Sequence, residues 1–502
     1  MAMLGLCLLG GCTVGPDFEK PKWAAPESWL SGPRQPVMKA SARTVSVEVE
    51  EPVDPEWWSL FDDPKLTALV RRVATENLDV QIAASRVAQS RDQLNIVGSA
   101  QFPSLNANAS YLHQHASNNG LFVVIPNAAG ASGRFGSTVG GVQSRGLKPF
   151  DIFQGGFDAS WELDLWGRIR RAVESSTASS TAAEEAQRAA LLSTLAEVAR
   201  DYIALRGTQA QLQIARDNVK IAQQSLSLTQ QRAAGGVTTD LDVANASAQL
   251  RATLADIPVL EQQEAELINA LSFLLGQAPN ALRADLETAN PVPPVPRRVP
   301  IGIPSELARR RPDIREAEAK LHAATADIGV AQAAFYPAVT LNGSVGLQAL
   351  QFAKVFDLDS RLYSLGPGVS VPLFEGGRLR ATLQLRESQQ QEAALIYQRT
   401  VLQAWREVDD ALTAYQAQQA RRDQLIQSVA DNKRALALAQ DRYATGIASF
   451  LDVLTAQRSL LLTQLELQRS TTIVSTNLVA LYKALGGGWE KDLPLQQTAM
   501  AK

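Results

Sequence analysis

The side chains of this sequence that could do chemistry are few and lie far apart. His113 and His115 are two of three histidines in 502 residues. On a strand their spacing would place both imidazoles on one face, as in part of a metal site. No cysteine or acidic residue stands beside them, so exposed imidazoles are favoured over a metal site. The run Arg309–Arg311 before Asp313 could bind an anion, but a solvated charged face is favoured.

Other signs of catalysis or cofactor binding are missing from the sequence. No glycine-rich loop precedes a lysine at phosphate-binding spacing, and no nucleophile has a base and an orienting group near it. The net charge of −3 gives no indication of a nucleic-acid partner. We therefore expect neither an enzyme nor a bound cofactor.

Cys12 is a candidate for lipid modification. It follows a short apolar run and the residues Leu9-Gly10-Gly11, which resembles a bacterial lipoprotein cleavage site. The run is too short to span a bilayer as a helix, so 1–11 is predicted to be a signal peptide. It lacks the basic residues expected ahead of a signal's apolar core, which indicates a start further upstream. The alternative is a buried cysteine in an apolar N-terminus. Removal of Cys7 with the signal would leave no disulfide.

The elements that must position these residues come in two copies. Three features of the stretch from Gly167 to Gly276 recur in the stretch from Gly377 to Gly486. They are the opening Gly-Arg pair, the turn that begins at Arg232 and again at Arg442, and the closing Leu-Gly pair. The differences 377 − 167, 442 − 232 and 486 − 276 all equal 210, so the register holds without an insertion. Such internal repetition precedes any assignment of fold. The chain is predicted to contain two structural repeats, at 65–290 and 305–488, joined by a proline-rich linker at 291–304.

Each repeat is predicted to contain one very long helix and a return helix. Over about 65 residues, a helix from 168 to 232 would be roughly 98 Å long. Apolar residues recur in it at every seventh position, which predicts coiled-coil packing: Leu191, Val198, Leu205, Leu212, Val219 and Leu226. The second copy, 378–445, follows with Val401, Val408, Tyr415, Val429 and Leu436, and is interrupted once at Arg422. The return helices are predicted at 239–275 and 449–485. Helices of this length span a distance or line a tube.

A shorter helix is predicted to open each repeat. The first runs from Lys65 to about Gln101, and the second from Ser305 to Phe335, each stopped by a following proline. The segment 12–64 is rich in proline and tryptophan and is predicted to be irregular. Residues 489–502 are predicted to form a C-terminal tail.

Two predicted β-hairpins follow these helices, at about 104–166 and about 338–374. Their residues alternate between apolar and polar over about ten positions per strand, the pattern of a transmembrane β-barrel. A soluble, half-buried sheet is the alternative. Four strands are too few to close a barrel, for which roughly eight is the smallest workable number, and open edges are not tolerated in lipid. Several chains must therefore share one barrel; three would supply twelve strands.

The chain resembles the TolC/NodT-type outer membrane factors, the lipoprotein channels of tripartite efflux systems. The resemblance rests on motifs that occur in the family's order: Leu-Gly-Gly-Cys12, Trp57-Trp58, Trp161-Glu-Leu-Asp-Leu-Trp-Gly-Arg168, Ile303 to Arg315, Phe335-Tyr-Pro337, Leu373 to Arg378, and Tyr443 to Val453. It implies an α+β membrane protein: a homotrimeric channel whose 12-stranded outer-membrane barrel continues into a periplasmic α-helical barrel. It also implies a periplasmic adaptor and an inner-membrane transporter, commonly of the proton-driven RND class, as partners.

The turns between the long and return helices are the candidate site. By resemblance to the family they form the periplasmic gate and receive the adaptor's helical tips; the residues concerned are Arg232, Gly236, Arg442, Tyr443 and Gly446. Asp242 and Asp452 would lie near the axis, where close carboxylates repel one another and attract cations. The spacing of Thr239 to Asp242 and of Ser449 to Asp452 also fits helix capping, and the two roles are compatible. Thr455 stands where the family often has a second Asp.

Two other functions fit the same sequence. A channel of this kind could serve type I protein secretion or metal-ion efflux instead of small-molecule export. A methionine cluster would have favoured soft metals, but Met38 and Met500 are the only methionines after the first three residues. A coiled-coil lipoprotein without a pore is the other alternative, and the period-two strands argue against it.

Overall fold

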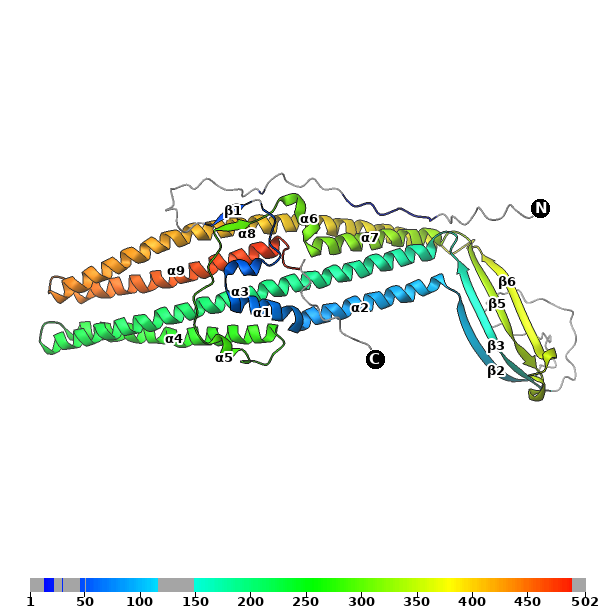
Figure 1. Ribbon diagram of the computed structural model, residues 1–502, viewed down its shortest axis with the longest axis horizontal. Coiled ribbons are helices and arrows are strands. Elements are labelled where there is room, and N and C mark those ends of the chain that lie inside the picture. Colours follow the sequence, from blue (N-terminus) through cyan, green and yellow to red (C-terminus); the bar gives the residue numbers. More distant parts are fainter. Residues whose placement is uncertain (1–12, 22–28, 30–45, 50, 116–148, 490–502) are drawn as a thin grey trace. The chain divides into compact units, whose positions relative to one another are not determined.

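Two long helical hairpins and a four-stranded sheet follow the duplicated sequence (Figure 1). The computed structural model describes residues 13–21, 29, 46–49, 51–115 and 149–489. The predicted signal peptide, Cys12, much of the irregular segment and nearly all of the C-terminal tail therefore lie outside the described residues. The chain divides into two compact units: one holds the sheet and the helix segments next to it, and the other holds the helical turns.

The four predicted strands form one antiparallel sheet (Figure 1). In the order β2-β3-β5-β6 they comprise Ser104–Gln114, Phe150–Leu163, Ala338–Ala349 and Arg361–Ser370. Among the described residues, β2 and β6 each pair with a strand on one side only. The second hairpin was predicted to extend to about residue 374, but its last strand, β6, ends at Ser370.

The strand register sorts the side chains onto two chemically distinct faces. Leu105, Ala159, Gly343 and Leu365 lie in one row across all four strands. On the opposite face, side-chain hydrogen bonds cross each strand pair: Asn108–Asp158 (2.5 Å), Ser160–Asn342 (2.9 Å) and Ser344–Ser364 (2.8 Å). The predicted alternation is therefore present in three dimensions, with large apolar residues exposed on one face and polar side chains linked on the other.

Each repeat contains one long and one return helix. Helices α3 (Arg168–Ala234) and α8 (Arg378–Ala444) have 67 residues each, whereas α4 (Asp240–Leu274) and α9 (Phe450–Ala484) have 35. The apolar residues at every seventh position of α3 are buried from Leu191 to Leu212, and those named in α8 are buried too. A coiled-coil seam thus holds these helices.

Close approach of two helices explains Gly207 within α3. A Cβ atom added there would collide with the side chain of Thr472 on α9, lying 2.7 Å from Cγ2. The equivalent position in α8, 210 residues later, is Ala417. The glycine is therefore needed for packing in one repeat and not for a turn.

Each repeat was predicted to open with one continuous helix, but the structure has two helices there. The first divides into α1 (Pro64–Glu76) and α2 (Leu78–Gly98), and the second into α6 (Leu307–Arg310) and α7 (Pro312–Ala333). Both breaks use the same device. Asn77 Nδ2 donates to the carbonyl of Leu274 at 2.8 Å, and Arg311 Nη1 donates to that of Ala484 at 2.9 Å. The two acceptors are 210 residues apart, so each side chain satisfies the end of its own return helix.

The irregular N-terminal segment contributes an aromatic core. Trp57, Trp58 and Phe61 are fully buried in a short 3-10 helix, η1 (Trp57–Phe61). The Trp57 ring stacks on Tyr482 at 5.6 Å, and its Nε1 donates to the carbonyl of Gly487 at 3.0 Å. These contacts fix the end of α9 to the start of the first repeat.

The linker between the repeats is held by a small sheet. β4 (Arg298–Pro300) pairs in parallel with β1 (Val47–Val49). Ahead of it, α5 (Arg283–Leu286) is a single turn after the return helix α4. The proline-rich linker is therefore paired as a strand at Arg298–Pro300.

Candidate functional site

The turn that ends α3 is a tight helix cap. The N–H of Gly236 donates to the carbonyl of Ala233 at 2.9 Å, and the N–H of Val237 donates to that of Arg232 at 2.9 Å. These are the two hydrogen bonds of a Schellman motif. Gly236 has a φ of +70°, and an added Cβ would meet nothing within 4 Å. The backbone conformation, and not space, therefore requires glycine here.

The turn that ends α8 has the same geometry. Gly446 has a φ of +78°, its N–H donates to the carbonyl of Tyr443 at 3.0 Å, and the N–H of Ile447 donates to that of Arg442 at 2.9 Å. Each residue of this motif lies 210 positions after its counterpart in the first turn. The sequence repeat is thus a repeat of backbone structure at the candidate site.

Arg232 connects the two turns within one chain. Its Nη1 donates to the main-chain carbonyls of Tyr443 at 3.0 Å and Ala444 at 3.2 Å at the end of α8, and the Tyr443 carbonyl also accepts from the N–H of Gly446. Its guanidinium carbon lies 4.6 Å from the centre of the Tyr443 ring, close enough for a cation–π interaction. The Tyr443 ring is buried and lies 5.7 Å from that of Phe450. The structure thus brings Arg232 and Tyr443 together as one clasp.

The counterpart of Arg232 has no such role within the chain. Arg442 is exposed, and its side chain makes no hydrogen bond or ion pair with any other described residue. The residue equivalent to Tyr443 is Ala233, which offers no ring. The duplicated turns are therefore alike in backbone and different in side-chain contacts.

The two predicted aspartates have unequal environments. Asp452 is exposed and its Oδ2 accepts from the backbone N–H of Ser449 at 3.0 Å and from its hydroxyl at 2.9 Å, in a capping box. Asp242 is half-buried and accepts hydrogen bonds from the hydroxyls of Thr238 and Thr239. Both carboxylates lie in the first turn of a return helix, where the helix dipole favours negative charge. The capping interpretation therefore describes Asp452 within one chain.

Thr455 does not join the aspartates. It is exposed, and its hydroxyl donates to the carbonyl of Leu451 in its own helix at 2.8 Å. Within the chain it therefore belongs to α9 alone.

The sequence analysis missed four exposed apolar residues at the turns. Val237 and Leu241 follow the first turn, and Ile447 and Leu451 follow the second, each with 63–69% of its surface exposed. The pairs are 210 residues apart, and this repetition of apolar type in polar turns was the signal that could have found them. We refer to these four exposed apolar residues as the tip surface.

The remaining candidates lie elsewhere. Cys12 is outside the described residues. His113 Nδ1 lies 2.7 Å from Asp151 Oδ1 across the β2–β3 pair, an acidic neighbour that sequence distance had hidden. In the part of the chain that the structure describes, no three His, Cys, Asp or Glu side chains gather in a way that could hold a metal ion. No helix in that part is long and apolar enough to cross a membrane.

The basic run before Asp313 is structural where it is described. Arg311 is buried, and its Nη2 lies 2.6 Å from Asp313 Oδ2 and 2.8 Å from Glu407 Oε2. Burial opposes the charged guanidinium, yet its two carboxylate partners raise the pKa of Arg311 above its ordinary value. Arg311 thus holds α8 and the end of α9 at the helix break. The interpretation as a solvated charged face was therefore wrong for this residue.

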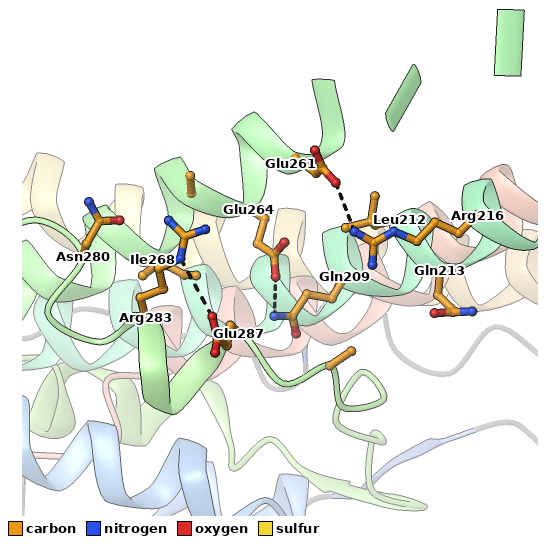
Figure 2. Close-up of a pocket in the computed structure, with 12 residues that line it drawn as sticks. Gln209, Leu212, Gln213, Arg216, Glu261, Glu264, Ile268, Asn280, Arg283 and Glu287 are labelled. Carbon is orange, nitrogen blue, oxygen red and sulfur yellow. Dashed lines mark hydrogen bonds and ion pairs between the residues drawn. The ribbon is translucent and has the colours of Figure 1, made fainter. Parts of the chain in front are cut away.

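A pocket of about 370 Å³ lies beside α3, α4 and α5 (Figure 2). Figure 2 shows its charged side chains directed toward partners: Arg216 and Glu261 are 3.0 Å apart, and Gln209 donates to Glu264 at 2.8 Å. Arg283 and Glu287 form a longer pair at 3.9 Å. The charged side chains named here are therefore engaged with one another, and nothing in the pocket indicates a reaction.

Comparisons with known proteins agree with this architecture. The family model of the outer membrane efflux proteins matches residues 69–277 and 303–487, which correspond to the two repeats. The chain is 34% identical over 449 residues to a pyoverdine export outer membrane protein, OpmQ, of Pseudomonas putida, covering 88% of this chain and 90% of that protein. It is 32% identical over 494 residues to a solvent efflux pump outer membrane protein, SrpC, of Pseudomonas putida, covering 97% and 98%.

The fold is also that of a solved channel. The structure of the outer-membrane channel OprN matches with a TM-score of 0.84 and 33% sequence identity, covering 96% of this chain and all of that chain. The likeness extends over the strands, the long helices and the turns alike.

Proposed function

The chain belongs to the family of outer membrane efflux proteins, and we propose that it works as a homotrimer in which three copies close one barrel. It is an outer-membrane channel of a tripartite efflux pump in a Gram-negative bacterium, and not an enzyme. The proposal concerns its assembly, its gate, its partners and its cargo.

The two unpaired sheet edges carry the proposal. β2 and β6 are the edges of a four-stranded antiparallel sheet, so they run in opposite directions. Placed beside β2 of a second copy, β6 would therefore continue the antiparallel pattern. Unpaired N–H and C=O groups cost several kcal/mol each in lipid, so the edges must find partners there.

The polar face of the sheet supports three copies over two. Two copies would give eight strands, and side chains fill the interior of an eight-stranded barrel. Three copies would give twelve strands and leave room for water inside. The side-chain hydrogen bonds across all four strands make the polar face a suitable lining for such a lumen.

Cross-linking and conductance test this assembly. In mild detergent, a lysine-independent cross-linker should give a trimer as the limiting species, and the same material should open channels in a planar bilayer. A dominant monomer or dimer that still conducts would contradict the shared barrel. A trimer that does not conduct would support the proposed assembly but contradict an open pore.

The tip surface supports a periplasmic partner. Exposed apolar residues at the turns, Val237, Leu241, Ile447 and Leu451, are suited to packing against another protein. We take that partner to be the helical hairpin of an adaptor, which would connect the channel to an inner-membrane transporter of the RND class. Gly236 and Gly446 shape the turns, and Arg442 remains free to meet the partner.

The same turns would form the gate. In a trimer, Asp242 and Asp452 would supply six carboxylates, and Thr455 would follow one turn later. Their mutual repulsion and attraction for cations would make a closed end that conducts poorly and prefers cations. The Arg232–Tyr443 clasp would hold the two hairpins of each chain in this arrangement.

The cargo is proposed to be small organic molecules. The relatives named for solvent efflux and pyoverdine export support this class. Accumulation of an organic dye and of silver or copper ions, in cells with and without the gene, separates organic cargo from metal ions. Retention of the metal but not of the dye in the deletion strain would overturn the organic assignment.

Cys12 is proposed to carry lipid. The Leu-Gly-Gly-Cys sequence supports this, and the lipid would hold the N-terminus at the outer membrane beside the barrel.

A further inference from the structure

The segment directly after Cys12 packs closely against the glycines Gly167 and Gly329. Gly15, with a φ of +104°, is in contact with Gly329 of α7, where an added Cβ on either glycine would collide. A Cβ at Gly329 would lie 2.9 Å from the carbonyl oxygen of Val14, and one at Gly167 would lie 2.6 Å from Cγ2 of Thr13. Real Cβ atoms do not approach so closely, so the segment occupies space that the three glycines leave open.

A buried arginine binds the backbone of this segment. The Arg171 side chain is 4% exposed. Its Nε donates to the carbonyl of Val14 and its Nη2 to that of Gly15, both at 3.3 Å, and Nη2 also lies 2.6 Å from Asp17 Oδ1. The N–H of Val14 in turn donates to the carbonyl of Trp166 at 3.1 Å. Main-chain recognition of this kind fixes the register of the segment as well as its position.

The far end of the segment is held by the second repeat. The Phe18 ring stacks on His322 of α7, with ring centres 4.5 Å apart. His322 Nε2 lies 2.9 Å from Glu174 Oε1, and Arg171 Nη1 donates to Glu174 Oε2 at 2.8 Å. The segment therefore contacts α3 of the first repeat and α7 of the second, within the unit that holds the sheet.

The groove opens beside an aromatic pair at the end of the sheet. The Trp166 ring stacks on Tyr336 at 4.8 Å, and its Nε1 donates to the carbonyl of Pro337 at 2.8 Å. These residues lie between the ends of β3 and β5 and the helices. Trp and Tyr at such positions mark the membrane–water interface of membrane proteins.

We propose that residues 13–18 form a strap whose groove, made by Gly167, Arg171, His322 and Gly329, joins the two repeats and fixes the point at which Cys12 leaves the protein. Cys12 is bonded to Thr13, so a lipid on it would enter the membrane beside the Trp166–Tyr336 pair. That consequence rests on the proposed lipidation; the strap and its groove do not. The groove is a peptide-binding site for the chain's own post-cysteine segment.

Hydrogen–deuterium exchange on the assembled Cys12→Ser protein tests the groove without the lipid. The backbone amide of Val14, which donates to the carbonyl of Trp166, should exchange at least tenfold more slowly than in the Gly329→Ala variant. Alanine favours a helix over glycine, so Gly329→Ala should keep α7 folded while its Cβ, 2.8 Å from Cγ of Arg171 and 2.9 Å from the carbonyl oxygen of Val14, displaces both the arginine and the segment. The matched control is Gly98→Ala in α2, where an added Cβ meets nothing within 4 Å and exchange of the segment should be unchanged.

A second pair of variants tests the arginine. Arg171→Met should release the segment to the same extent, whereas Arg170→Met, which removes a pair with Asp164 on the neighbouring face, should leave it protected. Fast exchange of the Val14 amide in the unaltered groove would overturn the strap, and so would equal exchange in each variant and its control. Fatty-acid labelling of Cys12 is measured separately, so loss of the lipid assignment would leave this result standing.

Discussion

Arg232 lies over the ring of Tyr443, with its guanidinium carbon 4.6 Å from the ring centre, and donates to the main-chain carbonyl of the same residue. One side chain thus caps a helix of the other repeat and covers an aromatic ring there. Its counterpart Arg442 makes neither contact within the chain. The duplicated turns have therefore diverged: one arginine serves the chain itself, and the other stays available.

Arg232→Met should loosen the end of α8. The substitution keeps much of the apolar stem but removes charge-assisted hydrogen bonds to two carbonyls, which contribute about 1.5–3 kcal/mol in comparable cases. Amides near Tyr443 should exchange roughly tenfold faster or more, while those of the strands should not change. Arg442→Met is the control, and it should leave local exchange near Ala233 unaltered. Equal effects of the two variants would show that the contacts seen for Arg232 do not stabilise the turn.

Gly236→Ala should destabilise the first turn by about 1–2 kcal/mol, because an L-residue pays that cost at positive φ. Gly235→Ala is a matched control: Gly235 does not have positive φ, and an added Cβ would make only ordinary contacts of 3.6 Å or more. Local hydrogen exchange is the suitable measurement because membrane trimers commonly unfold irreversibly. The same exchange rate in both variants would remove the conformational explanation for the glycine.

Two roles of Asp242 and Asp452 can be tested separately: their charge at the proposed gate and their capping of the return helices. The double variant Asp242→Asn and Asp452→Asn should shift the reversal potential across a salt gradient toward lower cation preference, because six charges would leave the proposed gate. Asparagine retains an acceptor, so stability should fall by only about 0.3–1 kcal/mol per site, through the lost charge–dipole interaction. An unaltered reversal potential in a well-folded double variant would leave the aspartates with local roles alone.

Asp452→Ala tests the capping role of Asp452 alone. It removes the acceptor for the N–H of Ser449 and should cost about 1 kcal/mol at the start of α9, seen as faster local exchange. Asp452→Asn is the control and should exchange nearly as slowly as the unaltered protein.

Cys12→Ser behind a complete signal peptide should abolish incorporation of a radioactive fatty acid. The trimer should still form, because strand pairing provides most of the membrane affinity. Labelling that persists in the variant would place the lipid on another residue and overturn the assignment to Cys12.

Local periodicity was enough to predict the repeats, the strands and the long helices. Apolar residues at every seventh position define the seam of α3 before any contact is known, and alternation does the same for β2 and β3. Glycine at Gly236 and Gly446 marked the turns because each needs a positive φ, which is a local property. Such features depend on neighbours along the chain and are therefore readable from it.

The remaining features depend on residues distant in sequence. The break at Asn77 contains neither proline nor glycine; Asn77 Oδ1 caps α2 by accepting from the N–H of Val80 at 3.0 Å, and its Nδ2 donates to the carbonyl of Leu274, nearly two hundred residues later. The partners of Arg232 and Arg171 are equally remote, so a basic residue in a turn and another near a strand end could not be told from solvated ones. The exposed apolar residues of the tip surface were readable in principle, because they recur with the repeat.

In the proposed trimer, the edges of β2 and β6, which have no partner strand among the described residues, pair between chains, so the channel forms by association of several molecules. A single chain would then have no closed barrel in lipid, so insertion should depend steeply on how many chains share a patch of membrane. A lipid on Cys12, with the strap holding it beside the sheet, would confine the search for partners to two dimensions and raise their effective concentration. Anchoring would then increase the rate of trimer assembly, most strongly when the concentration of chains is low.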